Sequence, residues 1–205
     1  MFPGFEVFDI APQGVRVHAR RGGSGPALLL LHGNPQTMAM WHRVAPALAE
    51  RFTVVLADLR GYGDSERVAD DAGHVAYSKR SMAGDMLGLM QAQGFARFAV
   101  LAHDRGARVA HRLALDHPEA ASRLMLLDIA PTLAMYESTT EAFARAYWHW
   151  FFLIQPSPLP ERAIEALMEE TMKALEADAG TVGMLAADGT EVELAGASGH
   201  SATGL

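Results

Sequence analysis

The chain has 205 residues, half of them hydrophobic and a fifth charged, and this composition predicts one globular fold with a buried core. The net charge of −7 and the lack of a basic block argue against nucleic acid as a partner. The absence of cysteine excludes disulfides, thiolate metal sites and a cysteine nucleophile. No stretch is apolar for long enough to cross a bilayer and no signal-peptide pattern opens the chain, so we expect a cytoplasmic protein without a membrane partner.

The first predicted elements are strands. Residues 6–10 and 15–20 flank the turn-like A-P-Q-G, which predicts an antiparallel hairpin. Residues 27–31 form a continuous apolar run, typical of a strand buried on both faces, and end in H-G-N-P-Q. A glycine after an internal strand lets a backbone N–H point into the cleft beyond the strand end, where an oxyanion would lie.

A helix over 41–51, a buried strand over 53–57 and a glycine-punctuated loop come next. In the loop, Asp58 and Asp64 are expected to accept backbone N–H groups, because no His or Glu has metal-ligand spacing to them. Ser78 and Ser81 are then placed to cap a helix that runs to about residue 93. Its inward stripe is expected to be Met82, Met86, Leu89 and Met90.

The run V-L-A-H-D-R-G-A-R at residues 100–108 is the feature around which the other motifs are arranged. An apolar strand over 98–102 arrives at Asp104 and a helix over 107–117 leaves it, with a small residue two before the acid and a glycine two after it. A sharp strand-to-helix turn requires such small neighbours, and it exposes its central side chain. A carboxylate at that centre attacks a saturated carbon and forms an ester, whereas a serine would transfer an acyl group.

The order of these elements predicts an α/β fold with a mostly parallel sheet flanked by helices. A further apolar strand over 122–127 ends at Asp128. His32, Asp104 and Asp128 each follow a different strand end, and ligands of such folds bind at the carboxyl ends of the strands. We therefore expect one cleft to collect the three regions.

Beyond the sheet, residues 137–154 are helical in pattern and aromatic, as in a cap, and most of these rings are expected to serve packing. His149 and Trp150 differ because their N–H donors would suit an anion in an apolar pocket. Residues 161–177 predict an amphipathic helix, and a weak hairpin about Asp188 and Gly189 precedes a flexible end. The expected domains are a core over 1–132, a partial helical cap over 133–178 and a Gly/Ala-rich tail over 179–205.

Taken together, the motifs resemble the fluoroacetate and haloacetate dehalogenase branch of the α/β-hydrolase superfamily over residues 2–164. The resemblance is carried by H-G-N-P-Q at 32–36, D-L-R-G-Y-G-D-S at 58–65, H-D-R-G-A-R at 103–108, L-D-I-A-P at 127–131 and A-R-A-Y-W-H-W at 144–150. It implies an α/β-hydrolase fold, a small halogenated carboxylic acid as substrate and no cofactor or metal. Relatives in this branch are commonly homodimers.

The resemblance also implies catalytic roles. Asp104 would attack the halogen-bearing carbon, and Asp128 would orient a catalytic histidine. Arg105 and Arg108 would bind the substrate carboxylate, because a spacing of three places both on one side of a helix and guanidinium groups match carboxylates.

Two further roles follow from the resemblance. His149 and Trp150 would donate hydrogen bonds to the departing halide. Backbone N–H groups of Asn34 and Arg105 would form the oxyanion hole during ester hydrolysis.

The sequence departs from this branch in three respects. Ala102 stands where relatives have Gly, and Asn34 stands where they usually have Phe, as in haloalkane dehalogenases. After residue 164 the resemblance fades, and two further strands and a late water-activating histidine are not identified. His200 is the only histidine of the tail, and we expect it to be exposed and not catalytic.

Two alternatives to haloacetate dehalogenation remain open. An epoxide hydrolase uses the same aspartate elbow, and Tyr136 and Tyr147 are available to protonate the opening oxygen. A catalytically incomplete fragment or anion-binding module would keep the anion pocket without turnover.

Overall fold

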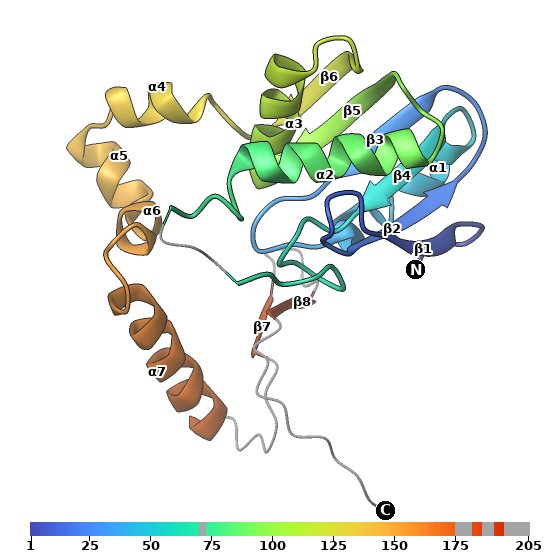
Figure 1. Cartoon of the computed structure of the whole chain (residues 1–205). Coiled ribbons are helices and arrows are strands. Elements are labelled where there is room, and N and C mark those ends of the chain that lie inside the picture. The colour runs from blue at the N-terminus through green and yellow to red at the C-terminus, as the bar shows by residue number, and fades with distance from the viewer. Residues whose placement is uncertain (70–72, 175–181, 186–190, 195–205) are drawn as a thin grey trace, which may run out of the picture. The chain divides into compact units, whose positions relative to one another are not determined.

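The computed structural model describes residues 1–69, 73–174, 182–185 and 191–194. The chain divides into two compact units, residues 1–131 and 132–205. The first holds a six-stranded sheet with its helices, and the second holds α4 to α7 and a two-stranded sheet (Figure 1). Within the described ranges, no helix is both long and apolar enough to cross a membrane.

The sheet of the first unit is mixed, with the strand order β1-β2-β4-β3-β5-β6. The first two neighbouring pairs are antiparallel, and the strands from β4 to β6 in this order are parallel. Its strands are β1 (Glu6–Ile10), β2 (Val17–Gly22), β3 (Ala27–Leu31), β4 (Thr53–Ala57), β5 (Phe98–His103) and β6 (Ala121–Leu127). The expected α/β fold with a mostly parallel sheet is thus confirmed, as is the opening hairpin.

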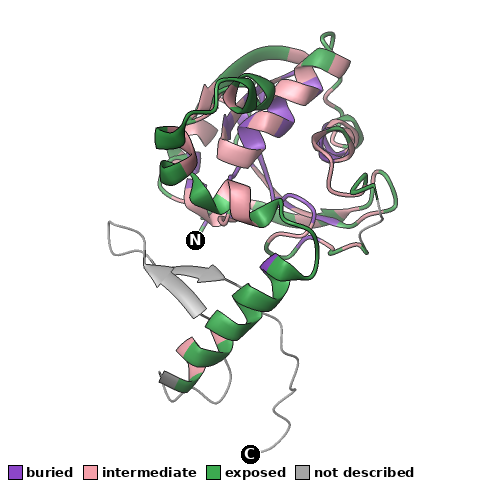
Figure 2. Cartoon of the chain, turned by 90° about the vertical axis from the view of Figure 1, so that its left-hand side faces the viewer, coloured by how far each residue is buried: buried purple, intermediate pink, exposed green. Residues whose placement is uncertain are grey.

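Helices on both faces explain why β3 and β4 are apolar throughout. Successive side chains of a strand point to opposite faces. Leu29 and Val55 pack in the cluster that includes residues of α2 (Lys79–Ala92) and α3 (Asp104–Asp116). Leu30 and Leu56 pack instead against the 3₁₀-helix η1 (Met38–Trp41) and α1 (Ala45–Ala49). In Figure 2 the buried residues of this unit are concentrated in the strands and in the helix sides that face them.

The helices before the elbow partly match the expectation. Ser78 caps α2 by accepting the N–H of Ser81 at 3.1 Å, and the four predicted inward residues are fully buried. The predicted helix over 41–51 is wrong in extent, since η1 ends at Trp41 and α1 starts at Ala45. Pro46 in the first turn of α1 has no N–H for the carbonyl four residues earlier, so one helix cannot run through both segments.

The second unit has four helices and a hairpin, namely α4 (Thr132–Glu137), α5 (Glu141–Ala146), α6 (Trp148–Leu153), α7 (Leu159–Ala174), β7 (Val182–Leu185) and β8 (Glu191–Leu194). The aromatic segment over 137–154 is helical, as expected, and forms α5 and α6 after the end of α4. Thr140 caps α5 by accepting the N–H of Phe143 at 3.2 Å. Strands β7 and β8 pair antiparallel, which confirms the hairpin. Its turn at Asp188 and Gly189, the expected flexible end and His200 lie outside the described residues.

Candidate active site

The sheet topology places the site before any side chain is considered. The chain passes from β3 to β4 on one side and later places β5 on the other side of β3. In such a sheet the crevice beyond the carboxyl ends of the two central strands is where ligands bind. The loop after β3 begins with His32, Gly33 and Asn34, and Asp104 directly follows β5.

The elbow at Asp104 has the strained backbone that such a turn requires. Asp104 has a φ of +42°, a left-handed conformation that few non-glycine residues adopt. A Cβ at Gly33 would lie 2.6 Å from the Cβ of Asp104, and a Cβ at Gly106 would lie 2.7 Å from the Cβ of Leu31. Close packing therefore requires glycine at position 33, in the loop after β3, and at position 106, two residues after Asp104.

The loop after β3 is bonded to the elbow. The main-chain N–H of Asn34 donates to Oδ2 of Asp104 at 2.9 Å, and the N–H of Gly106 donates to the carbonyl of His32 at 2.9 Å. The hydroxyl of Tyr62 donates to Oδ1 of Asn34 at 2.8 Å. The N–H expected to contribute to an oxyanion hole thus points at the carboxylate of Asp104.

Two arginines follow Asp104 on the same helix. The guanidinium of Arg105 lies over the ring of Tyr62 at 5.7 Å, and its buried Nε has no hydrogen-bond partner among the described residues. Arg108 donates from Nη1 to the carbonyl of Ala130 at 3.3 Å. Both arginines belong to the first two turns of α3, as their spacing indicates.

Lys79 is a further cationic side chain that the sequence analysis did not identify. Burial, followed by the charges of Arg105 and Arg108, lowers its pKa to about 8, and the carboxylate of Asp104 opposes the shift. One signal was available in the sequence: a lysine directly after a capping serine places a cation at the positive end of a helix dipole.

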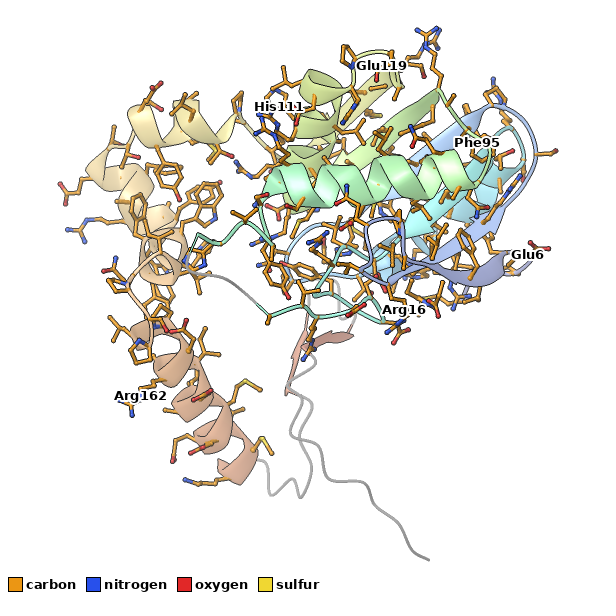
Figure 3. The ribbon with its side chains drawn as sticks, in the orientation of Figure 1. Glu6, Arg16, Phe95, His111, Glu119 and Arg162 are labelled. Atoms are coloured by element: carbon orange, nitrogen blue, oxygen red, sulfur yellow. The ribbon has the colours of Figure 1, made fainter. Side chains whose placement is uncertain are left out.

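Asp128, the acid expected to orient a catalytic histidine, lies near His103, which the sequence analysis did not predict as its partner. Nε2 of His103 lies 3.6 Å from Oδ2 of Asp128, and Nδ1 lies 3.2 Å from Oε1 of Gln36. The sequence analysis had no role for His103. The side chain of Asp128 is 86% exposed, and its φ is +55°. His111 lies two turns after Asp104 on α3 (Figure 3).

His32 and Asp58 are structural residues in this site. The buried ring of His32 bonds to the carbonyl of Gly33 through Nδ1 at 2.8 Å and accepts the N–H of Leu59 on Nε2 at 3.0 Å. Asp58 accepts the N–H groups of Met38 at 2.7 Å and Asp64 at 3.2 Å, as expected. The side chain of Asp64 is instead 81% exposed and lies 3.7 Å from Nε2 of His18. No group of three His, Asp or Glu side chains in the described ranges is arranged to hold a metal ion.

Comparison with known proteins places this geometry in a family. The family model for the alpha/beta hydrolase fold matches residues 26–187. The chain belongs to the α/β hydrolase fold family. The aspartate at the elbow, bonded to the loop after β3, stays the predicted nucleophile of this chain.

The similar α/β hydrolases include two enzyme classes. A fluoroacetate dehalogenase from Burkholderia sp. is 53% identical over 166 residues, which are 81% of this chain and 55% of that protein. A soluble epoxide hydrolase from Corynebacterium sp. strain C12 is 43% identical over 120 residues, 58% of this chain and 40% of that protein. This chain therefore spans about half the length of these curated relatives.

A solved structure agrees with this assignment. A protein of Nostoc sp. PCC 7120 assigned to the α/β hydrolases is 54% identical, with a TM-score of 0.80 over 86% of this chain and 61% of that one. The match to the fluoroacetate dehalogenase confirms the expected resemblance to such enzymes, and the structure from Nostoc confirms the α/β-hydrolase fold.

The predicted halide donors lie in the second unit. His149 and Trp150 are part of α6, His149 exposed and Trp150 half-buried. Trp150 packs in an aromatic cluster with Tyr136, Phe143 and Tyr147, with ring centroids 5.6 to 6.3 Å away. Their role toward a halide, like the roles of the other site residues, stays a prediction.

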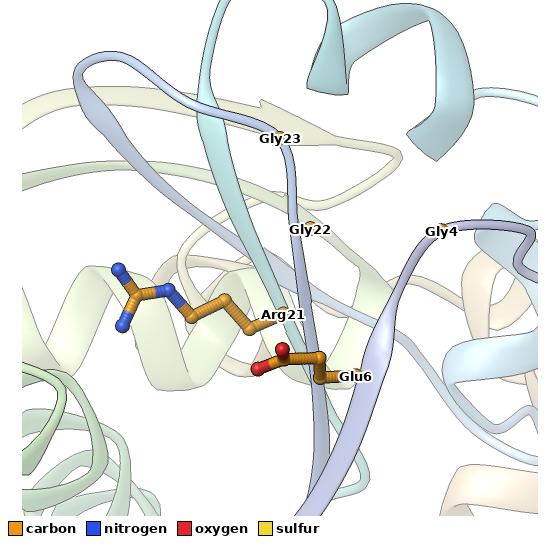
Figure 4. A pocket seen from close by; sticks show the side chains of 5 residues that line it. All are labelled: Gly4, Glu6, Arg21, Gly22 and Gly23. Carbon is orange, nitrogen blue, oxygen red and sulfur yellow. The ribbon is translucent and has the colours of Figure 1, made fainter.

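A separate hollow of about 280 Å³ lies between β1 and β2 (Figure 4). Three glycines line it together with Glu6 and Arg21. Arg21 and Glu6 extend to the same side of the strands, and Arg21 donates from Nη1 to Oε1 of Gln93 at 3.1 Å. Because Arg21 is bonded to Gln93, the hollow has fewer side chains available to bind a ligand than the segment around Asp104.

Proposed function

We propose that this chain carries the nucleophilic part of a haloacetate dehalogenase, with fluoroacetate or chloroacetate as substrate. The observation that carries the proposal is the position of Arg105 and Arg108, one and four residues after the nucleophile on the same helix. Two guanidinium groups beside a carboxylate nucleophile suit a substrate that bears its own carboxylate next to the reacting carbon. The similarity to a fluoroacetate dehalogenase supports this choice.

The reaction proceeds in two displacements. A carboxylate oxygen of Asp104 attacks the carbon that bears the halogen, the carbon–halogen bond breaks, and its electron pair leaves with the halide. Water then attacks the carbonyl carbon of the resulting ester, and the bond to the glycolate oxygen breaks. One proton of the water passes to that oxygen, and the other is released to solvent as the carboxylate of Asp104 is regenerated. In the first step, His149 and Trp150 bind the departing halide. In the second step, the backbone N–H groups of Asn34 and Arg105 stabilise the oxyanion.

The test is halide release from chloroacetate and fluoroacetate, with the intact mass of the protein recorded on the same samples. The proposal expects halide release together with either unmodified protein, if the ester is hydrolysed, or a stable gain of one carboxymethyl group on Asp104. A single turnover in ¹⁸O-labelled water should place the label in Asp104. If no halide is released and the mass of the protein does not increase, the proposal is overturned and a non-catalytic anion-binding module is favoured.

A second candidate, an epoxide hydrolase, is supported by the similarity to the Corynebacterium enzyme. In this reaction Asp104 attacks an epoxide carbon, and Tyr136 or Tyr147 protonates the leaving oxygen. Neutral epoxides need no guanidinium pair. Ester formation with styrene oxide but not with chloroacetate would therefore favour this candidate.

A further inference from the structure

The ring of His103 lies between side chains from two neighbouring segments. His103 is the last residue of β5 and directly precedes Asp104. Its Nε2 lies 3.6 Å from Oδ2 of Asp128, which follows β6, and its Nδ1 lies 3.2 Å from Oε1 of Gln36 in the loop after β3. The side chain is 23% exposed, so solvent reaches part of the ring. A partly exposed histidine beside an acid is the usual arrangement of a general base.

The same ring borders the predicted nucleophile. A Cβ at Gly33 would lie 2.9 Å from Nδ1 of His103 and 3.0 Å from Oδ2 of Asp104. Because both atoms border this one point, they are no more than about 6 Å apart, a span that one water molecule bridges with two hydrogen bonds. A water held by Nδ1 can therefore reach the carboxyl group of Asp104.

The neighbours of His103 decide which ring nitrogen can act. A carboxylate only accepts hydrogen bonds, so we assign the N–H of the neutral ring to Nε2, the nitrogen that faces Asp128. Nδ1 then has a free electron pair. The carboxamide of Gln36 suits either state of Nδ1, because half a turn exchanges its oxygen for its NH₂ group. Its contact of 3.2 Å is at the upper end of hydrogen-bond lengths, so a water can replace it.

We propose that His103 is the general base of ester hydrolysis in this chain, with Asp128 as the acid that orients it. The inference rests on the proposed function for the ester on Asp104 and adds the residue that hydrolyses it. Nδ1 takes one proton from the attacking water as the water oxygen bonds to the carbonyl carbon. When the bond to the glycolate oxygen breaks, the imidazolium gives that proton to it, and the acid formed at Asp104 loses the other proton to solvent.

The first test separates the two steps in His103→Gln with chloroacetate. Ester formation in a single turnover should change less than about threefold, because His103 acts only in the second step. Hydrolysis of the ester should slow about a hundredfold or more, the usual contribution of a general base. Once chloroacetate is removed, intact mass should show the carboxymethyl group disappearing from the unchanged protein and persisting on His103→Gln. The control is His117→Gln, at a ring beside Glu119, and it should behave like the unchanged protein.

Asp128→Asn tests the base without changing its ring. The side chain of Asp128 is 86% exposed and its φ is +55°, a conformation that Asn adopts readily, so this variant should fold like the unchanged protein. It should slow ester hydrolysis about tenfold or more, because the imidazolium loses its counter-charge, and should leave ester formation within about threefold. If His103→Gln does not fold, this variant decides the matter.

Gln36→Ala distinguishes a base from a tether. It removes the contact at Nδ1 but keeps the ring and Asp128, so it should slow ester hydrolysis much less than His103→Gln does. An equal loss in the two variants would mean that the ring only holds the loop after β3 in place, and it would overturn the inference.

The ester on the unchanged protein separates this inference from the proposed function. A carboxymethyl group that persists there after chloroacetate is removed would overturn the inference and leave the dehalogenase proposal standing. Equal hydrolysis in His103→Gln, or a folded His103→Gln that forms no ester, would also overturn the inference. An ester that forms only with styrene oxide would overturn the dehalogenase proposal, and the same variants are then compared with that ester. If neither compound forms an ester, both proposals fail.

Discussion

The main-chain N–H of Asn34 and the carboxylate of Asp104 are joined by a hydrogen bond of 2.9 Å across 70 residues of sequence. The bond links the segments that follow the two central strands, so the sheet itself sets the position of Asp104. It also defines a donor that would face the carbonyl oxygen of an ester formed on Asp104. The relationship makes the acid at the elbow the first residue to test.

Replacing Asp104 with Asn should abolish ester formation and halide release, by about a thousandfold or more, because an amide is not a competent nucleophile. The amide oxygen can still accept the N–H of Asn34, so the free energy of unfolding should change by less than about 1 kcal/mol. Intact mass, halide release and urea denaturation measure the three quantities. Asp64→Asn, in a side chain that is 81% exposed, is the control and should retain activity.

Tyr62 allows its hydroxyl and its ring to be tested separately. Tyr62→Phe removes the hydrogen bond to Asn34 but keeps the ring beneath Arg105, and it should slow ester formation about three- to tenfold. Tyr62→Leu also removes the ring and should weaken binding of chloroacetate as well. Single-turnover rates over a range of chloroacetate concentrations distinguish the two effects. Identical behaviour of the two variants would contradict this division.

The parts of the fold that the sequence predicted are those determined by local residue pattern. Strands β3 and β4 are uninterrupted apolar runs, and α2 has a serine cap and a regular stripe of buried residues. In each case the local pattern is enough to predict both the type of element and the side chains that it buries. The elbow was predictable because Asp104 needs small neighbours on both sides. The break in the predicted helix over 41–51 was missed because a single residue, Pro46, decides where α1 starts.

The missed parts of the site depend on contacts distant in sequence. Tyr62 is 28 residues from Asn34, and nothing in its loop indicates that its hydroxyl reaches the segment after β3. The contact of His103 with Asp128 likewise depends on the register between β5 and β6. Lys79 comes near the two arginines of α3 only because α2 packs on α3. Such contacts follow from topology and not from local pattern.

The buried pair of Arg60 and Asp85 should matter greatly for stability. Nε and Nη2 of Arg60 each donate to one oxygen of Asp85 at 2.7 Å. Asp85→Ala leaves a buried guanidinium without its counter-charge, and it should lower the free energy of unfolding by about 3–5 kcal/mol. The double replacement Arg60→Met and Asp85→Leu should cost considerably less. Urea denaturation measures the free energy of unfolding of both variants. The control is Glu141→Ala, in an exposed pair with Arg145, which should lower this free energy by about 0.5 kcal/mol or less.

His32 should make the stability of the protein depend on pH. Burial is the largest influence on this histidine and lowers its pKa below the ordinary 6.5. The folded state therefore binds fewer protons than the unfolded state once the pH falls below about 6.5. The contribution of His32 is present in full above that pH and is lost as the pH falls toward the lowered value.

Between pH 7.5 and 5, this term should lower the free energy of unfolding by up to about 2 kcal/mol. His32→Gln should be less stable at pH 7.5, because the bonds to Gly33 and Leu59 are disturbed, and should show a smaller loss on acidification. His117→Gln, at a partly exposed ring, should keep the pH dependence of the unchanged protein. Urea denaturation across this pH range measures all three proteins. The free energy of unfolding could instead fall equally with pH for the unchanged protein and His32→Gln. His32 would then bind a proton as readily in the folded as in the unfolded state, which would contradict the hydrogen bond that its Nε2 accepts from Leu59.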